Sequence, residues 1–162
     1  MTDAQFVFSA PGTPQQNGVV EKTFATLYDK VGTIWNFVHI QGKIHNTLWA
    51  ECKKTATDLD TILYGKENME NYHTKMFKKN PDFVTHLQIF GEIGIVLSHK
   101  QIGRISKISN KGKEAFFVGY ATDHTSDVYH ICNPSTKRIK ISRDVRWIGK
   151  FYNDRHPIEI PN

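Results

Sequence analysis

The apolar residues of this chain change their spacing near its middle, and this change limits the folds that the chain can adopt. In the first part, apolar residues recur every three or four positions, which is the spacing of one face of an α-helix. The two series are Val20, Phe24, Leu27, Val31, Ile34 and Val38, then Leu48, Cys52, Ala56, Leu59 and Leu63. They predict two amphipathic helices, joined at residues 41–43, that bury their apolar faces against each other or against a sheet.

The second part of the chain has the composition of short β-strands. Residues 65–86 are polar and are predicted to be a linker or an irregular excursion, and β-rich runs follow them. The runs are residues 87–97, 115–121, 128–132, 138–142 and 145–147. Gly91, Gly94 and Gly119 lie inside these runs and indicate bulges or tight bends. Five short strands with such glycines predict a small barrel or sandwich, so the expected fold class is α+β.

Composition narrows the class of protein further. The chain has 162 residues, of which 39% are hydrophobic, which is enough for a core. No apolar run approaches the roughly 20 residues needed to cross a membrane, and the first residues carry no signal-like stretch. We therefore expect a soluble, intracellular protein without a membrane partner.

The cysteines and histidines give little support to a metal site. Cys52 and Cys132 form no C-x-x-C pair, which excludes a zinc ribbon and suits a reducing compartment. A bridge between the two cysteines stays an open alternative. His124 and His130 lie near Cys132 but lack a fourth ligand at a zinc-site spacing, so structural roles are favoured.

Positive charge is concentrated in the second part of the chain. The net charge is +5: residues 1–64 contain five Lys or Arg against six Asp or Glu (−1), and residues 65–162 contain sixteen against ten (+6). This excess favours nucleic acid as a partner, with an ordinary solubilising surface as the alternative. The residues expected to contact phosphates are Lys100, Arg104, Lys107, Lys111 and Lys113, then Lys137, Arg138, Lys140, Arg143 and Arg146. A small barrel carrying them could follow a phosphate backbone without reading base sequence, or could contact a protein.

Two groups of motifs resemble a known family. The stretch Pro14-Gln-Gln-Asn-Gly-Val-Val-Glu21 resembles the end of the catalytic core of copia-type retrotransposon integrases, where the last acid of a D,D-E triad ends such a stretch. A later series resembles the SH3-like β-barrel that follows this core in the same Pol polyproteins. Its motifs are Phe90-Gly-Glu92, Phe117-Val-Gly-Tyr120, Asp127-Val-Tyr129, Asn133-Pro134 and Ser142-Arg-Asp-Val-Arg-Trp147. Leu48-Trp-Ala-Glu51 lies between the two groups and is also similar, so the likeness covers nearly the whole chain in the family's order.

The resemblance implies a domain organisation and a function. The implied segments are residues 1–64 (end of a ribonuclease-H-like integrase core), 65–86 (linker), 87–150 (SH3-like β-barrel) and 151–162 (tail). The implied function is DNA integration with nucleic-acid binding, in the nucleus or a virus-like particle. The implied partners are DNA and the remainder of the Pol polyprotein, with a homo-oligomer as an open option. The alternative is a free-standing or domesticated SH3-like module that binds nucleic acid or protein.

The resemblance also implies candidate catalytic residues. In such a core, three carboxylates hold magnesium ions for strand transfer. Glu21 matches the third acid and metal ligand. Asn17 lies one helical turn earlier and could touch substrate or orient Glu21. The twenty residues before Glu21 contain no match for the family's other two aspartates, so this segment is expected to be catalytically incomplete alone and to need no cofactor by itself.

Helix geometry makes a separate prediction about the surroundings of Glu21. At 100° per residue, Glu21 lies about 100° from Val20, at the border of the buried face, where a half-buried metal ligand would be. The alternative is a first-turn acid that complements the helix dipole. Without the rest of a core, the two helices are expected to expose an apolar face.

Overall fold

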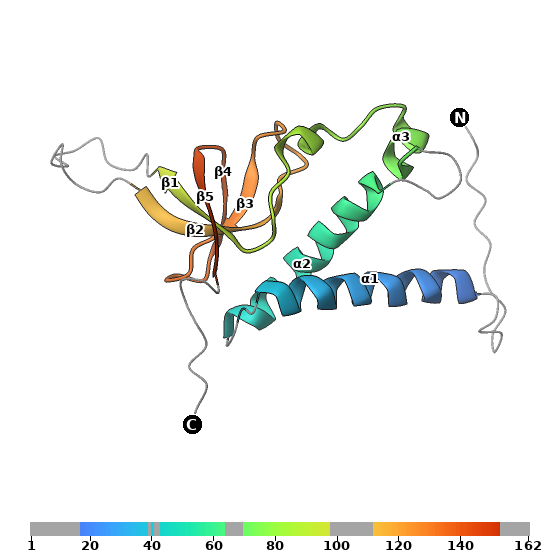
Figure 1. The fold of residues 1–162 in the computed structure, drawn as a ribbon, viewed down its shortest axis with the longest axis horizontal. Helices are drawn as coiled ribbons and strands as arrows, with labels where there is room; N and C mark the ends of the chain where they lie inside the picture. The colour runs from blue at the N-terminus through green and yellow to red at the C-terminus, as the bar shows by residue number, and fades with distance from the viewer. Residues whose placement is uncertain (1–16, 39, 41–42, 64–69, 98–111, 153–162) are drawn as a thin grey trace, which may run out of the picture.

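The computed structural model describes residues 17–38, 40, 43–63, 70–97 and 112–152 of the chain (Figure 1). Helices occupy the first part and an antiparallel sheet occupies the second, so the predicted α+β class is confirmed at this level. None of the helices in these ranges is long and apolar enough to span a membrane.

The two long helices occur where the hydrophobic spacing predicts them. Helix α1 (Gly18–Val38) and helix α2 (Lys43–Ile62) contact each other, and α2 also contacts the sheet (Figure 1). The predicted face of α2 is buried over its first part, at Leu48, Cys52 and Ala56. Complete burial of a side chain the size of leucine stabilises a fold by about 1.5–3 kcal/mol, so this face supplies much of the attachment between helices and sheet.

The predicted face of α1 is buried only in its second half. Val31 and Val38 are buried, whereas Val20 is 48% exposed and Phe24 is 47% exposed. The prediction of one continuous buried stripe is therefore wrong for the first half of α1. The expectation that the helices leave an apolar face uncovered fits this half, where Val19, Val20, Phe24 and Tyr28 are each about half exposed or more.

The segment predicted to be a linker contains two short helices. Helix α3 (Tyr72–Phe77) begins at Asn71, whose side chain accepts a hydrogen bond from the Thr74 backbone N–H at 2.7 Å. Lys78 ends the helix in the left-handed conformation. A 3-10 helix, η2 (Asp82–His86), follows and buries Phe83. The sequence did not predict these two helices, because a polar cap and a single aromatic anchor order the segment without any apolar periodicity.

Five antiparallel strands form the sheet, in the order β4-β3-β2-β1-β5. The strands are β1 (Glu92–Leu97), β2 (Gly112–Tyr120), β3 (Tyr129–Cys132), β4 (Ile139–Ser142) and β5 (Val145–Phe151). The ladder between β2 and β3 is irregular between Phe117 and Gly119. The ladder between β1 and β5 is irregular between Glu92 and Gly94. The predicted bulges at Gly94 and Gly119 are thus confirmed.

The sheet is rolled, as a small barrel requires. Strands β4 and β5 are the outer strands of the order, and in a flat sheet they would lie about 19 Å apart at about 4.8 Å per strand. Yet only two residues join them, and the three steps from Ser142 to Val145 can span at most about 11 Å. The rings of Tyr129 on β3 and Trp147 on β5 confirm the curvature, since their centroids are 5.2 Å apart although two strands separate them.

The rolled sheet has an apolar core on each face. The core shared with the helices includes Val31, Val38, Leu48, Cys52, Ala56, Phe90, Ile93, Phe116, Val118 and Cys132. The core inside the roll includes Phe83, Ala115, Phe117, Tyr120, Tyr129 and Ile131, with Trp147 packed against it. Both cysteines are free and fully buried, and burial raises the pKa of Cys52 to about 12 and that of Cys132 to about 11. The thiols therefore act as small core residues.

Gly91 lies where the chain enters the sheet and passes against α1. Its φ is +82°, a conformation that favours glycine, and a Cβ there would lie 2.3 Å from Cγ1 of Val38. The predicted tight bend at Gly91 is confirmed, and it brings the start of β1 close to the end of α1.

Candidate functional site

Glu21 and Asn17 lie at the exposed end of α1. Asn17 immediately precedes the helix and Glu21 lies in its first turn, and both residues are exposed. The prediction that Glu21 borders a buried face is wrong in the described part of the chain, because the neighbouring stripe residues Val20 and Phe24 are themselves about half exposed. The metal-ligand role of Glu21 stays a prediction from the resemblance.

A magnesium site takes several oxygen ligands in a fixed arrangement. Within the described ranges, no three His, Cys, Asp or Glu residues lie close enough together to hold a metal ion. Glu21 alone therefore does not fit such a site, and no reaction step follows from the described residues.

The exposed half of α1 carries several exposed apolar and aromatic side chains. Val19 is 81% exposed, and Phe24 and Tyr28 are 47% and 48% exposed. Trp49 of α2 is 46% exposed, and it lies with Phe24 and Tyr28 around the ammonium of Lys53. Exposed apolar patches commonly mark contact sites.

Six of the ten predicted phosphate-contacting residues are described, and all six are exposed or partly exposed. Lys113 lies on β2, Lys140 on β4 and Arg146 on β5, and the other three lie in turns: Lys137, Arg138 and Arg143. The remaining four, Lys100, Arg104, Lys107 and Lys111, lie outside the described residues.

Two strand-linking turns present the turn residues. In the β3–β4 turn, the Asn133 side chain accepts hydrogen bonds from the backbone N–H groups of Ser135 and Thr136 at 3.0 and 2.9 Å. Lys137 closes this turn in the left-handed conformation, with its N–H donating to the Asn133 carbonyl at 2.8 Å. Residues 134–136 form the turn between the two strands.

The outer strands and the turns beside them carry a group of exposed cations. We call Arg138, Lys140, Arg143, Arg146 and Lys150 the basic seam, because they follow the two edges that the roll brings together. In the β3–β4 ladder Lys140 lies opposite Ile131, so its side chain lies on the face of the sheet that holds the core inside the roll. In the β1–β5 ladder Arg146 lies opposite Ile95, and its side chain lies on the other face. The seam therefore presents charge from both faces of the sheet rather than from one flat surface.

Arg143, at the centre of the basic seam, is held in place by an acid. Its Nε donates to Oδ2 of Asp127 at 2.6 Å. Hydrogen bonds from Thr125 and from Arg143 lower the pKa of Asp127. The guanidinium is thus oriented at the link between β4 and β5 while most of it stays exposed.

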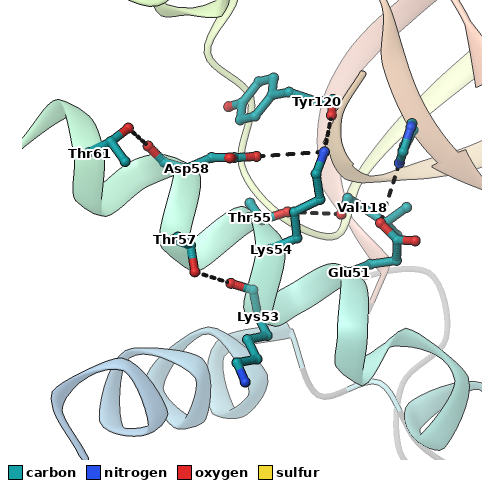
Figure 2. A network of polar contacts seen from close by, with 10 residues as sticks. Glu51, Lys53, Lys54, Thr55, Thr57, Asp58, Thr61, Val118 and Tyr120 are labelled. Carbon is teal, nitrogen blue, oxygen red and sulfur yellow. Dashed lines mark hydrogen bonds and ion pairs between the residues drawn. The ribbon is translucent and has the colours of Figure 1, made fainter. Parts of the chain in front are cut away.

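Polar contacts that sequence reasoning missed fix the helices against the sheet (Figure 2). Thr55 donates its hydroxyl to the Val118 carbonyl at 2.9 Å, and Lys54 donates to the Tyr120 carbonyl at 2.8 Å. Val118 is the unpaired residue of the bulge in β2, and a bulge leaves such a backbone group free for another partner. We call these two hydrogen bonds the α2–β2 latch. The sequence offers no signal for it beyond the bulge glycine.

Glu51 and His130 add a third contact between α2 and the sheet. Oε2 of Glu51 lies 3.3 Å from Nδ1 of His130, and each side chain is about one-fifth exposed. His130 thus has a structural partner, in agreement with the preference for a structural role.

Asp58 lies beside the latch, at the edge of a cavity. The cavity has a volume of about 250 Å³ and lies between α2, α3 and the loop after β2. Oδ2 of Asp58 is buried without a hydrogen bond, and the nearest cation, Lys54 Nζ, is 4.0 Å away, which is too long for a hydrogen bond. Burial raises the pKa of this carboxyl, and the charge of Lys54 offsets part of the effect.

Comparison with known proteins agrees with the motifs. Residues 96–159 match the family described as "Retroviral polymerase SH3-like domain". The chain is also similar to "Retrovirus-related Pol polyprotein from transposon TNT 1-94" of Nicotiana tabacum, with 26% identity over 137 residues. That alignment covers 85% of this chain and 10% of the relative, so the chain spans about a tenth of that protein's length. No solved structure matches the chain. The matches confirm the resemblance to a region of a copia-type Pol polyprotein.

Proposed function

We propose, from the premise that this chain corresponds to a region of a copia-type retrotransposon Pol polyprotein, that it belongs to the integrase region and binds DNA with its rolled sheet. The observation that carries the proposal is the basic seam. Residues 137–150 contain six Lys or Arg and a single acid, Asp144, and the five seam residues all reach solvent. Accessible cations along two adjacent edges attract a polyanion at long range and neutralise its phosphates on contact.

The expected contacts are to the phosphate backbone. The seam residues lie on strands and tight turns, and no described helix near them projects side chains as a groove-reading helix does. Phosphate contacts fix the position of a protein on a duplex without carrying sequence information. We therefore expect binding that depends strongly on salt and weakly on base sequence.

A second part of the proposal concerns the helices. Glu21 and the exposed apolar start of α1 support an origin in a ribonuclease-H-like core, whose remaining segments would cover Val19 and Val20. Magnesium would be held by Glu21 only together with carboxylates from those segments, and integration is proposed only for the complete integrase. The nucleus or a virus-like particle is the proposed location. A module that binds protein instead is the competing function, favoured by the same apolar surface.

Fluorescence anisotropy with the full chain and a labelled duplex tests DNA binding. The variant Lys140→Glu with Arg146→Glu reverses two seam charges, and the control Lys22→Glu with Lys75→Glu makes the same change in net charge on exposed residues of α1 and α3. Only the seam variant should weaken binding strongly. It should also flatten the plot of log K against log salt by about 0.9 for each phosphate that the variant no longer neutralises.

Two outcomes would contradict the proposal. An equal decrease in affinity for both variants would mean that only the net charge matters. Absence of duplex binding by the unaltered chain at about 50 mM salt, where phosphate contacts are strongest, would favour the protein-binding alternative.

A further inference from the structure

Three aromatic rings enclose one cation on the helical surface opposite the latch. Nζ of Lys53 lies 5.5 Å from the ring centroid of Phe24, 5.4 Å from that of Tyr28 and 5.3 Å from that of Trp49. We call these three rings the aromatic cage. Figure 2 shows Lys53 extending from α2 toward α1, away from the contacts with the sheet.

Helix geometry builds the cage. Phe24 and Tyr28 are four residues apart on α1, and Trp49 and Lys53 are four residues apart on α2, so each pair lies on one side of its helix. Each ring is nearly half exposed, and therefore solvent reaches the cage. Ring faces carry negative charge density and attract cations, most strongly in tryptophan.

The three distances are long for an ammonium and suit a larger cation. Each distance from the nitrogen to a ring centroid is 5.3–5.5 Å, near the outer limit of about 6 Å for a cation–π interaction. Methyl groups on the nitrogen, each bonded at about 1.45 Å, would add apolar surface toward the three rings and keep the positive charge.

We infer that the aromatic cage is a binding site for the trimethylated lysine side chain of a partner protein, and that Lys53 occupies it in the free chain. The ligand has the same four-carbon stem that Lys53 already places among the rings. Its quaternary nitrogen keeps the positive charge and adds apolar surface toward the rings. Aromatic enclosure is the general way in which proteins recognise such cations.

Lys53 can leave the cage without breaking another contact. Among the described residues its ammonium has no hydrogen bond or ion pair, and the three rings are its neighbours. A bare ammonium is compact and strongly hydrated, so water competes well for it. A trimethylated ammonium cannot donate hydrogen bonds to water, and it therefore gains more from the rings.

NMR with the ¹⁵N-labelled full chain tests the inference through the indole N–H signal of Trp49. The probes are a peptide containing trimethyllysine, the same peptide with unmodified lysine, the same peptide with a neutral tert-butyl side chain of equal shape, and tetramethylammonium chloride. We expect the trimethyllysine peptide to shift the Trp49 signal and to leave the signals of Trp35 and Trp147 in place. The lysine peptide and the neutral peptide should bind at least about fivefold more weakly, because each lacks the methyl contacts or the charge.

Two variants link the binding to the cage. Lys53→Ala empties the cage and should tighten binding of the trimethyllysine peptide about fivefold, the factor that corresponds to one exposed cation–π interaction. The control Lys22→Ala removes an exposed lysine of α1 and should change nothing. Phe24→Leu keeps an apolar side chain at an exposed position and should weaken binding several-fold while the dispersed signals of the sheet persist.

The inference is overturned if the neutral peptide binds as tightly as the trimethyllysine peptide, because the surface would then be a general apolar patch. Simultaneous shifts of all three tryptophan signals would overturn it in the same way. Binding of tetramethylammonium as tight as that of the peptide would mean that a small quaternary amine, and not a protein side chain, is the ligand. None of these outcomes depends on the binding of DNA by the basic seam.

Discussion

Replacement of Thr55 by valine tests whether the α2–β2 latch holds the two parts of the molecule together. Thr55 is 1% exposed, and its hydroxyl donates to the Val118 carbonyl at 2.9 Å. Valine has nearly the same shape but no hydroxyl, so Thr55→Val removes the donor without opening a cavity. Val118 is fully buried, and its carbonyl would then have neither this donor nor water.

The expected loss of stability follows from leaving the Val118 carbonyl without a hydrogen-bond donor. A buried acceptor without a partner costs about 1–3 kcal/mol, so we expect the free energy of unfolding to fall by about 2 kcal/mol. For a chain of this length, each kcal/mol corresponds to a change of about 2–4 °C in Tm. The expected decrease in Tm is therefore about 4–8 °C.

Urea unfolding followed by circular dichroism measures the change. Thr57→Val is the matched control, because Thr57 is an exposed residue of the same helix whose hydroxyl donates to the carbonyl of its own preceding turn. The control should change the free energy of unfolding by less than about 0.5 kcal/mol. Equal stability of the two variants would refute the view that the latch joins helices to sheet, and so would a normal midpoint for Thr55→Val.

Three further predictions concern the core. Gly91→Ala should lower the free energy of unfolding by about 2–4 kcal/mol, since the residue combines a positive φ with an occupied Cβ position; urea unfolding with no change would contradict this. Burial raises the pKa of Asp58, so its contribution to stability is greatest below its unfolded pKa, about 3.9, and is lost as the pH rises through the folded value. Asp58→Asn should therefore stabilise the fold at pH 7 but not at pH 3. A variant that is less stable at pH 7 would mean that the ion pair with Lys54 outweighs desolvation. Cys52 and Cys132, with pKa values near 12 and 11, should react with a thiol reagent at pH 8 only as the protein unfolds, and rapid labelling of either in the native state would contradict their burial.

Apolar spacing predicted the two long helices but not what covers them. Leu48 and Cys52 recur at helical spacing and are buried as predicted, and so are Val31 and Val38. Val20 has the same spacing and is half exposed, because periodicity identifies the apolar face of a helix and carries no information on which segment packs against each turn. The same limit explains why the exposure of Glu21 was not predicted.

The strands were predicted more completely than the segment before them. The glycines at positions 94 and 119 marked real irregularities in the ladders, since a residue without a side chain is tolerated where the strand must bend. Helix α3 was missed because the side chain of Asn71 orders it, and a single cap gives no periodic signal.

The candidate sites show the same difference between features that a local sequence pattern reveals and contacts that depend on the completed fold. Exposed charge can be counted from sequence, so four of the five seam residues were among the predicted contacts, although Lys150 and the arrangement along two joined edges were not. The latch joins Thr55 to a residue 63 positions later, and the aromatic cage combines two helices. Contacts of this kind depend on the completed fold, and no local pattern encodes them.

The pairing of β1 with β5 has a consequence for how this chain reaches its native state. Glu92 pairs with Phe151, so β1, the first strand of the sheet, cannot complete its pairing before β5, the last strand, has formed. Contacts between residues far apart in sequence slow folding, because the intervening chain must be ordered before they form. We expect the α1–α2 pair to form early from local contacts and the roll to close in a late, rate-limiting step. During synthesis, β1 would stay without one of its two partners until the last strand has left the ribosome, and in that interval its open edge would be the part of the molecule most exposed to aggregation.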